Sequence, residues 1–182
     1  MTVRWNQFWE RHGQVVLWFL AYSVLGWAYE VFLEVVVYRW GFSDRGVLFG
    51  PYCPVYGFGA LAFLLFFRKF TRSRRPLWVR LTGTFLGCMV VATLIELASS
   101  YLLEWLTGSW PWQTYVDYGI QFQGRIALSP SIRFGLGGLV FLFLLQPLLE
   151  RATGALPEKW RTVLPQVVTV WLLVDLCLTV VL

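Results

Sequence analysis

Residues 81–106 read LTGTFLGCMVVATLIELASSYLLEWL. This stretch holds two charged residues, Glu96 and Glu104, and is otherwise apolar or small. A helix needs about 20 such residues to cross the hydrocarbon core of a bilayer. The stretch therefore predicts a transmembrane helix. Further apolar runs predict an all-α bundle of about five such helices, with the others at 13–38, 55–70, 131–149 and 165–182.

The composition supports the same fold class. Of the 182 residues, 58% are hydrophobic and 14% are charged, whereas about a quarter of the residues in a soluble domain are charged. The chain also contains 11 Trp and 8 Tyr, whose rings favour the interface between membrane and water. We expect an integral membrane protein in which residues 1–182 form a single transmembrane domain.

The segments between the apolar runs differ in character. Residues 39–54 (RWGFSDRGVLFGPYCP) hold Gly and Pro in quick succession, which predicts a loop or a re-entrant segment packed by protein. The remaining segments are predicted as a short interfacial helix (1–12), a basic loop (68–80), a polar aromatic loop (107–130) and a short polar turn (150–164).

Positive charge orients the predicted bundle. With five spans, eleven Lys and Arg residues lie on one side of the membrane and four on the other. The richer side should be cytoplasmic, which places the amino terminus inside and the carboxyl terminus outside. Topology accounts for the net charge of +5 better than nucleic-acid binding does. Topology alone explains the basic loop at 68–80, although this loop could also contact anionic lipid.

Acidic residues collect near the outer end of the predicted bundle. Glu30 lies about 25 Å along the helix from Gly13, and Glu96 about 24 Å from Arg80, at ~1.5 Å per residue. Both carboxylates thus fall in the outer half of a hydrocarbon layer about 30 Å thick. Other polar residues belong to the same end: Glu34, Asp44, Arg45, Glu104, Asp117 and Arg125.

Helical spacing suggests how these acids are arranged. Glu30 and Glu34 share one helix face, and Glu96 shares a second face with Ser100 and Glu104. A carboxylate in hydrocarbon is costly and should find a partner in the protein interior. Arg45 and Arg125 are the available cations, so we predict a cluster of Glu30, Glu96, Arg45 and Arg125. The sequence supports a functional and a purely structural role for this cluster about equally.

Other residues carry weaker signals. Asp175 is either a proton site or the partner of a hydroxyl on a neighbouring helix. Gly83 and Gly87 form a GxxxG step that indicates close helix packing. The chain contains no G-x-x-x-x-G-K-[ST] string, no HExxH and no CxxC. We therefore expect no ATP site of the P-loop type, no metal site and no cofactor.

Several strings resemble those of a known bacterial family. These are GWAYE (26–30), DRGVLFGPYCPVYGFG (44–59), ELASSYLLEWLTGSW (96–110) and DYGIQFQGRIAL (117–128). The chain resembles the putative ABC-transporter type IV, or CmpB-like, family. The resemblance implies a small polytopic protein of the cell membrane with permease-like character. It also indicates a functional cluster of Glu30, Arg45, Tyr56, Glu96, Ser99, Glu104, Asp117 and Arg125.

Three functions follow. The first is a transporter component or small permease with a charged binding site near the outer side, assisted by a second copy, a partner membrane subunit or a separate ATPase chain. The second is an intramembrane enzyme that uses the glutamates and arginines on a lipid or lipid-linked substrate, since burial can tune a carboxyl group for acid–base work. The third is an assembly or scaffold protein without chemistry.

Overall fold

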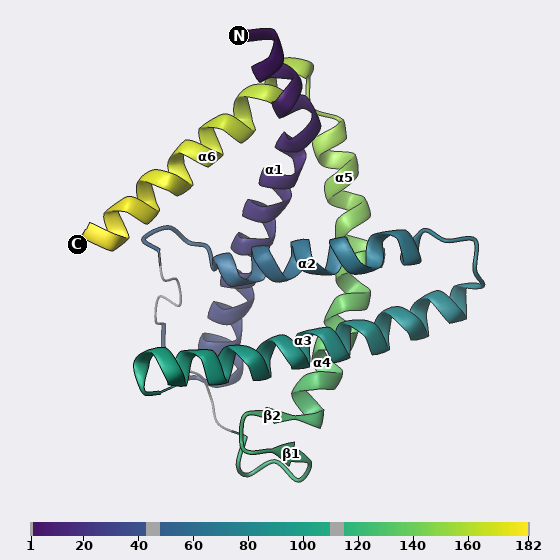
Figure 1. Cartoon of the computed structure of the whole chain (residues 1–182), viewed down its shortest axis with the longest axis vertical. Helices are drawn as coiled ribbons and strands as arrows, with labels where there is room; N and C mark the ends of the chain where they lie inside the picture. Colours follow the sequence, from purple (N-terminus) through teal and green to yellow (C-terminus); the bar gives the residue numbers. More distant parts are fainter. Residues whose placement is uncertain (1, 43–47, 110–114, 182) are drawn as a thin grey trace. The chain divides into compact units, whose positions relative to one another are not determined.

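The structure, a computed structural model, describes residues 2–42, 48–109 and 115–181. These residues form the helices shown in Figure 1, which confirms the all-α class. The helices are α1 (Thr2–Phe32), α2 (Pro54–Thr71), α3 (Leu77–Thr107), α4 (Leu128–Val140), α5 (Gln146–Gly154) and α6 (Glu158–Val181). A π-helical turn, Leu33–Val37, extends α1, and a second one, Phe141–Leu145, joins α4 to α5.

Within the described residues, four helices are long and apolar enough to cross a membrane. They are His12–Val37, Leu77–Leu106, Leu128–Gly154 and Glu158–Thr179, with mean hydropathies between 1.6 and 1.8. Helix α2 forms where the sequence predicted it, but it is not among these four. It has 18 residues, and Arg68 and Lys69 occupy its last turn, so its apolar stretch is short of the ~20 residues that a span requires.

Two predicted boundaries are wrong. The predicted polar turn at 150–164 is helical except at residues 155–157, and α6 begins at Glu158 rather than at residue 165. Pro165 lies inside α6, where its missing N–H leaves the Arg161 carbonyl without its helical partner. Gly13 of α1 lies against this point, and its missing side chain leaves room for the proline ring. The predicted interfacial helix at 1–12 is continuous with the first span.

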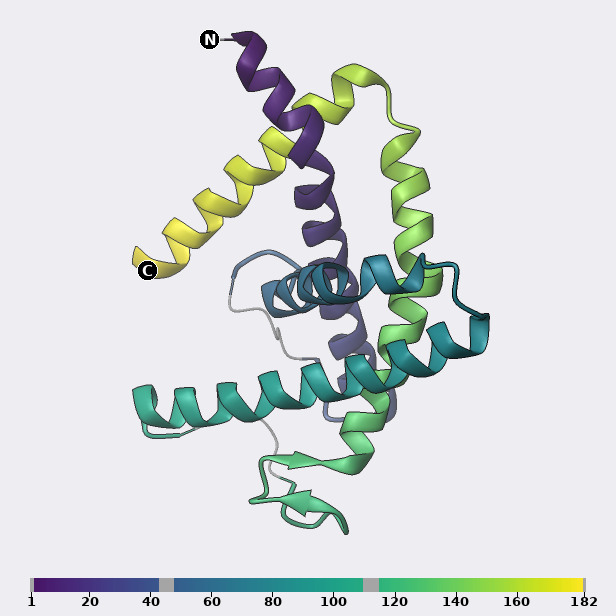
Figure 2. The same ribbon diagram turned by 45° about the vertical axis from the view of Figure 1, so that its right-hand side comes forward.

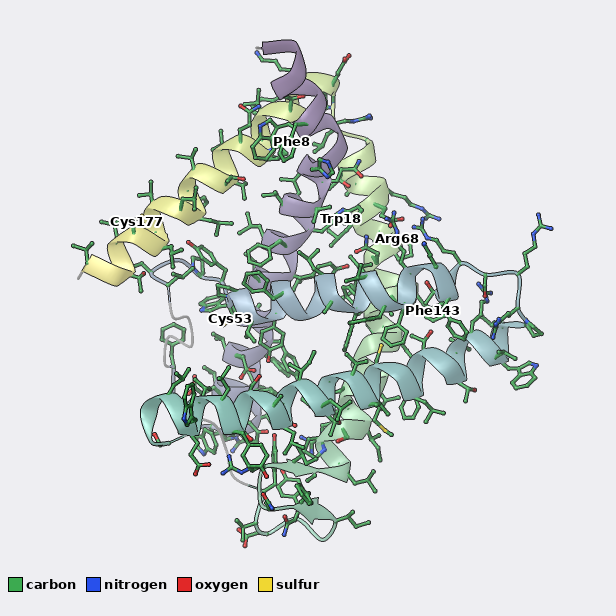
Figure 3. All side chains as sticks on the ribbon, in the orientation of Figure 1. Phe8, Trp18, Cys53, Arg68, Phe143 and Cys177 are labelled. Atoms are coloured by element: carbon green, nitrogen blue, oxygen red, sulfur yellow. The ribbon has the colours of Figure 1, made fainter. Side chains whose placement is uncertain are left out.

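The helices belong to two compact units. The first comprises Met1–Ala62 with Pro147–Leu182. Within it, α6 packs against α1, as Figures 1 and 2 show. Trp18 of α1, labelled in Figure 3, donates a hydrogen bond of 3.2 Å to the Thr153 hydroxyl of α5. Near the start of α2, Gly57 fits closely against Phe19 and Ser23 of α1.

The second unit comprises Phe63–Gln146 and is built on the packing of α3 against α4. Glycines make this approach close, because Gly138 lies against Cys88 and Gly135 against Phe85. A hydrogen bond of 2.7 Å from the Thr93 hydroxyl to Ser131 adds a polar contact. The predicted close packing at Gly83 and Gly87 is confirmed, since rings from the end of α2 fill the space beside both glycines.

The predicted aromatic loop at 107–130 contains a β-hairpin. Strand β1 (Gln121–Phe122) pairs antiparallel with β2 (Ile126–Ala127), with Phe122 opposite Ile126. The two turn residues, Gln123 and Gly124, both have positive φ angles, 53° and 65°. Such a turn matches the twist of the flanking strands. It places Arg125 directly after the turn, with its amide bonded to the Phe122 carbonyl at 3.0 Å.

Candidate functional site

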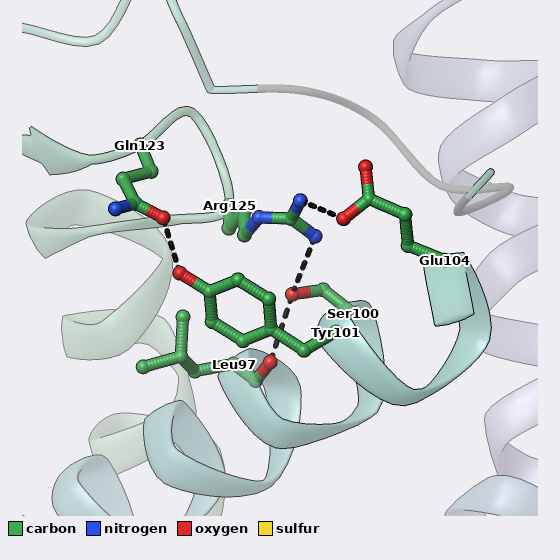
Figure 4. Close-up of polar contacts among 6 residues, drawn as sticks. All are labelled: Leu97, Ser100, Tyr101, Glu104, Gln123 and Arg125. Carbon is green, nitrogen blue, oxygen red and sulfur yellow. Dashed lines mark hydrogen bonds and ion pairs between the residues drawn. The ribbon is translucent and has the colours of Figure 1, made fainter. Parts of the chain in front are cut away.

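Arg125 is the centre of a polar network on the second unit. Its side chain is 8% exposed and reaches from the hairpin to the last turns of α3, as Figure 4 shows. The guanidinium forms an ion pair with Glu104 and donates a hydrogen bond of 3.3 Å to the Ser100 hydroxyl. Its carbon lies 4.2 Å from the centre of the Tyr101 ring. Charge, hydrogen bond and ring contact together satisfy a cation that would otherwise be costly to bury.

The spacing of α3 explains why these groups meet one arginine. Ser100 and Glu104 are four residues apart and share a helix face, as predicted, with Tyr101 beside them. The Tyr101 hydroxyl in turn donates to the side-chain amide oxygen of Gln123 in the hairpin turn. The network therefore fixes both the turn and the residue after it to the end of α3.

Glu96 lies on α3 about two turns before Glu104. It contacts the segment that leads from α3 into the hairpin. The Tyr115 hydroxyl donates a hydrogen bond of 2.9 Å to its Oε1. Tyr118 packs edge-on against Tyr115 with ring centres 5.1 Å apart. The second carboxylate oxygen of Glu96 is buried, and it has no hydrogen-bond partner among the residues that the structure describes. Glu96 thus keeps one acceptor open.

The environment of Tyr115 favours its neutral form. Burial raises the pKa of the Tyr115 hydroxyl, and the hydrogen bond to Glu96 and the charge of that carboxylate raise it further. Arg133 acts in the opposite direction and is the smaller influence. Tyr115 therefore remains a proton donor to Glu96 at any physiological pH.

In the first unit, Glu30 is held by a tyrosine. The Tyr56 hydroxyl, near the start of α2, donates a hydrogen bond to Oε1 of Glu30 on α1. Gly26 lies one turn before Glu30, and the Tyr56 ring occupies the space that a side chain would need there. Tyr56 was predicted from the family motif, and its contact with Glu30 gives the pairing a physical basis.

Asp175 of α6 is also partnered. Its carboxylate accepts hydrogen bonds from the backbone N–H groups of Phe49 and Gly50, at 3.0 and 3.1 Å, and from the Tyr52 hydroxyl. The predicted hydroxyl partner therefore exists, but it comes from the loop before α2 rather than from a neighbouring helix. Sequence reasoning missed the two backbone donors, although the Gly-Pro step at residues 50–51 indicated irregular backbone, whose N–H groups need partners outside a helix.

The structure brings together only some of the residues of the predicted functional cluster. Glu96, Ser99, Glu104, Asp117 and Arg125 lie in the second unit, where the structure joins Arg125 to Glu104. Ser99 is half-buried on α3, and Asp117 is exposed. Glu30 and Tyr56 pair in the first unit, and Arg45 lies outside the described residues. Among the residues that the structure does describe, no group of three or more His, Cys, Asp or Glu side chains could hold a metal ion.

The fold and these sites define a multi-pass helical membrane protein. The chain matches the family described as "Putative ABC-transporter type IV" (CmpB) over residues 17–180 and belongs to that family. No curated protein and no solved structure matches the chain.

Proposed function

We propose that this chain is the membrane-embedded component of a transporter in the cell membrane, with residues 1–182 as one transmembrane domain. Membership of an ABC-transporter-type family and four apolar helices support this proposal. The sequence holds no P-loop string, so energy from ATP would come from a separate ATPase chain.

Within this function, we propose that Glu96 binds the solute or the coupling ion. The observation that carries the proposal is the buried Oε2 atom of Glu96, which lacks a partner among the described residues. A buried acceptor without a partner is costly and gains most from a ligand that supplies a donor or a positive charge. Arg125 is a poorer candidate, because Glu104, Ser100 and Tyr101 already satisfy it. The favoured solute is therefore a cation or a hydrogen-bond donor.

The proposed orientation puts this site on the outer side. If α2 crosses the membrane, five spans place the basic turn before α3 inside and the hairpin after α3 outside. If α2 does not cross, the same two segments still lie on opposite sides, and the excess of cations makes the basic turn cytoplasmic again. In both arrangements α6 ends outside. The two arrangements differ in the side on which residues 1–11 and 38–53 lie.

We further propose that residues 48–53 enter the membrane as a re-entrant segment. Its support is the hydrogen bond of 2.9 Å from the Cys53 amide to the Ser23 carbonyl. Ser23 lies near the middle of the span His12–Val37, at a depth where irregular backbone needs protein partners. Asp175 and Ser23 supply such partners to residues 49, 50, 52 and 53.

The test is flux through purified protein in proteoliposomes, measured as the uptake of labelled inorganic cations, organic amines, neutral solutes and anions. We expect uptake of members of the cationic or donor-bearing classes, and Glu96→Gln should reduce this uptake while folded yield is kept. Glu104→Gln is the matched control, because it removes the same charge from the same helix. Glu30→Gln tests the second glutamate in the same assay. Uptake unchanged by Glu96→Gln would overturn the assignment of this residue.

Two further measurements separate the other functions. An intramembrane enzyme would form product from lipid or lipid-linked substrates in detergent, where no gradient exists. A scaffold would lose folding and function in parallel when Glu96 is changed to Gln. Co-purification with an ATPase chain, and dependence of flux on ATP, would identify the energy source.

A further inference from the structure

The turn between α2 and α3 carries unusually uniform charge. Residues 45–95 contain no Asp or Glu. In the second unit the acidic residues are Glu96, Glu104 and Asp117. The first of these lies 16 positions beyond Arg80 on α3, about 24 Å at ~1.5 Å per residue. The cations of this turn therefore have no acidic neighbour within their own segment of the chain.

Four of these cations are exposed, and we define the basic turn patch by three of them, Lys69, Arg74 and Arg75; the fourth is Arg72. Arg75 lies over the ring of Phe70, with 5.4 Å from its guanidinium carbon to the ring centre. This contact holds the arginine stem while it leaves the charge accessible.

The turn that presents the patch is internally fixed. Arg80 donates from Nη1 to the Thr71 carbonyl at 2.7 Å, and the Thr71 hydroxyl bonds to the Arg68 carbonyl at 3.0 Å. The Ser73 amide bonds to the Phe70 carbonyl at 3.1 Å. The Phe70 ring itself sits where Gly83 of α3 has no side chain. The patch is therefore preorganised, which lowers the ordering cost of binding.

Apolar side chains adjoin the patch at the start of α3. Leu77 is 55% exposed and Trp78 is 70% exposed. Further along α3, an exposed apolar stripe continues at four-residue spacing through Leu86, Val90 and Leu94, on a helix that is long and apolar enough to span the membrane. Tryptophan favours the headgroup boundary, with hydrocarbon on one side of it and polar groups on the other. The surface thus changes from apolar to cationic along the helix, as a lipid does from acyl chain to phosphate.

We propose that the basic turn patch binds the phosphate headgroup of an anionic phospholipid, whose acyl chains lie along the exposed stripe of α3. This site is separate from the transport site at Glu96. An acidic protein surface would also complement the three cations, but it would leave Trp78 and the continuous apolar stripe without a partner. The lipid accounts for both halves of the surface.

The experiment compares retention of phosphatidylglycerol and phosphatidylcholine by purified protein, measured by native mass spectrometry at increasing salt. The triple variant Lys69→Gln/Arg74→Gln/Arg75→Gln should weaken phosphatidylglycerol binding by roughly a hundredfold, since each cation near the surface contributes about fivefold. Phosphatidylcholine binding should not change. The charge-retaining variant Arg74→Lys/Arg75→Lys should bind nearly as the natural chain does.

A matched control removes three exposed cations elsewhere, in Arg133→Gln/Arg151→Gln/Lys159→Gln. If this control loses as much phosphatidylglycerol as the patch variant, net charge and not a local site governs binding, and the proposal is overturned. It is also overturned if the patch variant retains phosphatidylglycerol fully. If retention is unchanged and the patch variant instead fails to capture an ATPase partner, the surface belongs to a protein.

Discussion

The Tyr115 hydroxyl donates a hydrogen bond of 2.9 Å to Oε1 of Glu96. This single contact ties the connection before the hairpin to the middle of α3. It also orients the carboxylate, so that Oε2 is the atom left without a partner among the described residues. The proposed ligand site and the packing of the hairpin therefore depend on the same pair of side chains.

Tyr115→Phe tests this dependence. It removes the donor to Glu96 and leaves the aromatic ring in place, so we expect a loss of about 1–2 kcal/mol in the free energy of unfolding. Thermal unfolding in detergent, followed by intrinsic fluorescence, measures the change. Tyr118→Phe is the control because it keeps the edge-on ring contact. Equal stability of Tyr115→Phe and the natural chain would show that the bond contributes little.

Alkaline pH should destabilise the protein. Burial and the hydrogen bond to Glu96 raise the pKa of Tyr115. The folded state then binds this proton more tightly than the unfolded state, in which tyrosine titrates near pH 10. The resulting stability is fully present below about pH 10 and is lost as pH rises above it. Unfolding midpoints between pH 8 and 11 measure this loss, which should be smaller in Tyr115→Phe.

The two partners of the ion pair between Arg125 and Glu104 should contribute unequally to the free energy of unfolding. Arg125→Met removes a buried cation together with its contacts to Ser100 and Tyr101, whereas the Glu104 side chain is 42% exposed. We expect Glu104→Gln to cost only about 1 kcal/mol, because solvent screens an exposed carboxylate and the amide oxygen can still accept from Arg125. Arg125→Met should cost about 3 kcal/mol, because it also removes the hydrogen bond to Ser100 and the contact with the Tyr101 ring. Chemical or thermal unfolding of both variants and the double variant gives the coupling energy. A larger cost for Glu104→Gln would contradict this assignment.

Two adjacent glycines of α4 should respond in opposite directions to alanine. A side chain at Gly138 would collide with Cβ and Sγ of Cys88 on α3, whereas one at Gly137 meets nothing within 4 Å among the described residues. We expect Gly138→Ala to destabilise the protein by about 1–3 kcal/mol through overpacking. Gly137→Ala should be neutral, or stabilising by up to about 1 kcal/mol through helix propensity. Unfolding midpoints of the two variants and of the natural chain measure both changes. A Gly138→Ala variant as stable as the natural chain would contradict the expected overpacking.

Asp175→Asn should loosen the segment before α2. An amide cannot accept from Phe49, Gly50 and Tyr52 together, because one of its two polar atoms is a donor. The neighbouring thiol of Cys53 is buried, and we expect it to react faster with maleimide in this variant. Thr179→Val is the control, since it alters a neighbour of Asp175 without removing the carboxylate. An unchanged labelling rate at Cys53 would show that other contacts hold the segment.

The apolar runs predicted the helices well because length and hydropathy are local properties. The first span, predicted at 13–38, is His12–Val37, and α2 fills its predicted range. The boundary error arose where a tertiary contact overrides the local signal. The predicted last span began at Pro165, but α1 leaves room for the proline ring at Gly13 and α6 continues through it. The predicted fifth span, α2, forms a helix but is not among the four that are long and apolar enough to cross a membrane, because Arg68 and Lys69 shorten its apolar stretch.

The candidate site was harder to predict than the helices. Helical spacing placed Ser100 and Glu104 on one face, and Arg125 meets both. Nothing in the spacing indicated Tyr115, because its bond to Glu96 depends on the path of the chain after α3. The donors to Asp175 were hidden for the same reason, since they are backbone groups of a loop about 125 residues away. Long-range polar contacts require the fold, whereas amphipathic faces do not.

The π-helical turn at Phe141–Leu145 affects how the chain tolerates a change in length. Such a turn holds one residue more than an α-helical turn would. Deleting one residue there can therefore restore a regular α-helical turn and leave the next residues facing nearly as they do now. Gln146, which is buried directly after the turn, would keep its direction, whereas the same deletion inside α4 would rotate it by roughly 100°. The π-helical turn is therefore the place in this helix that best tolerates the loss of one residue.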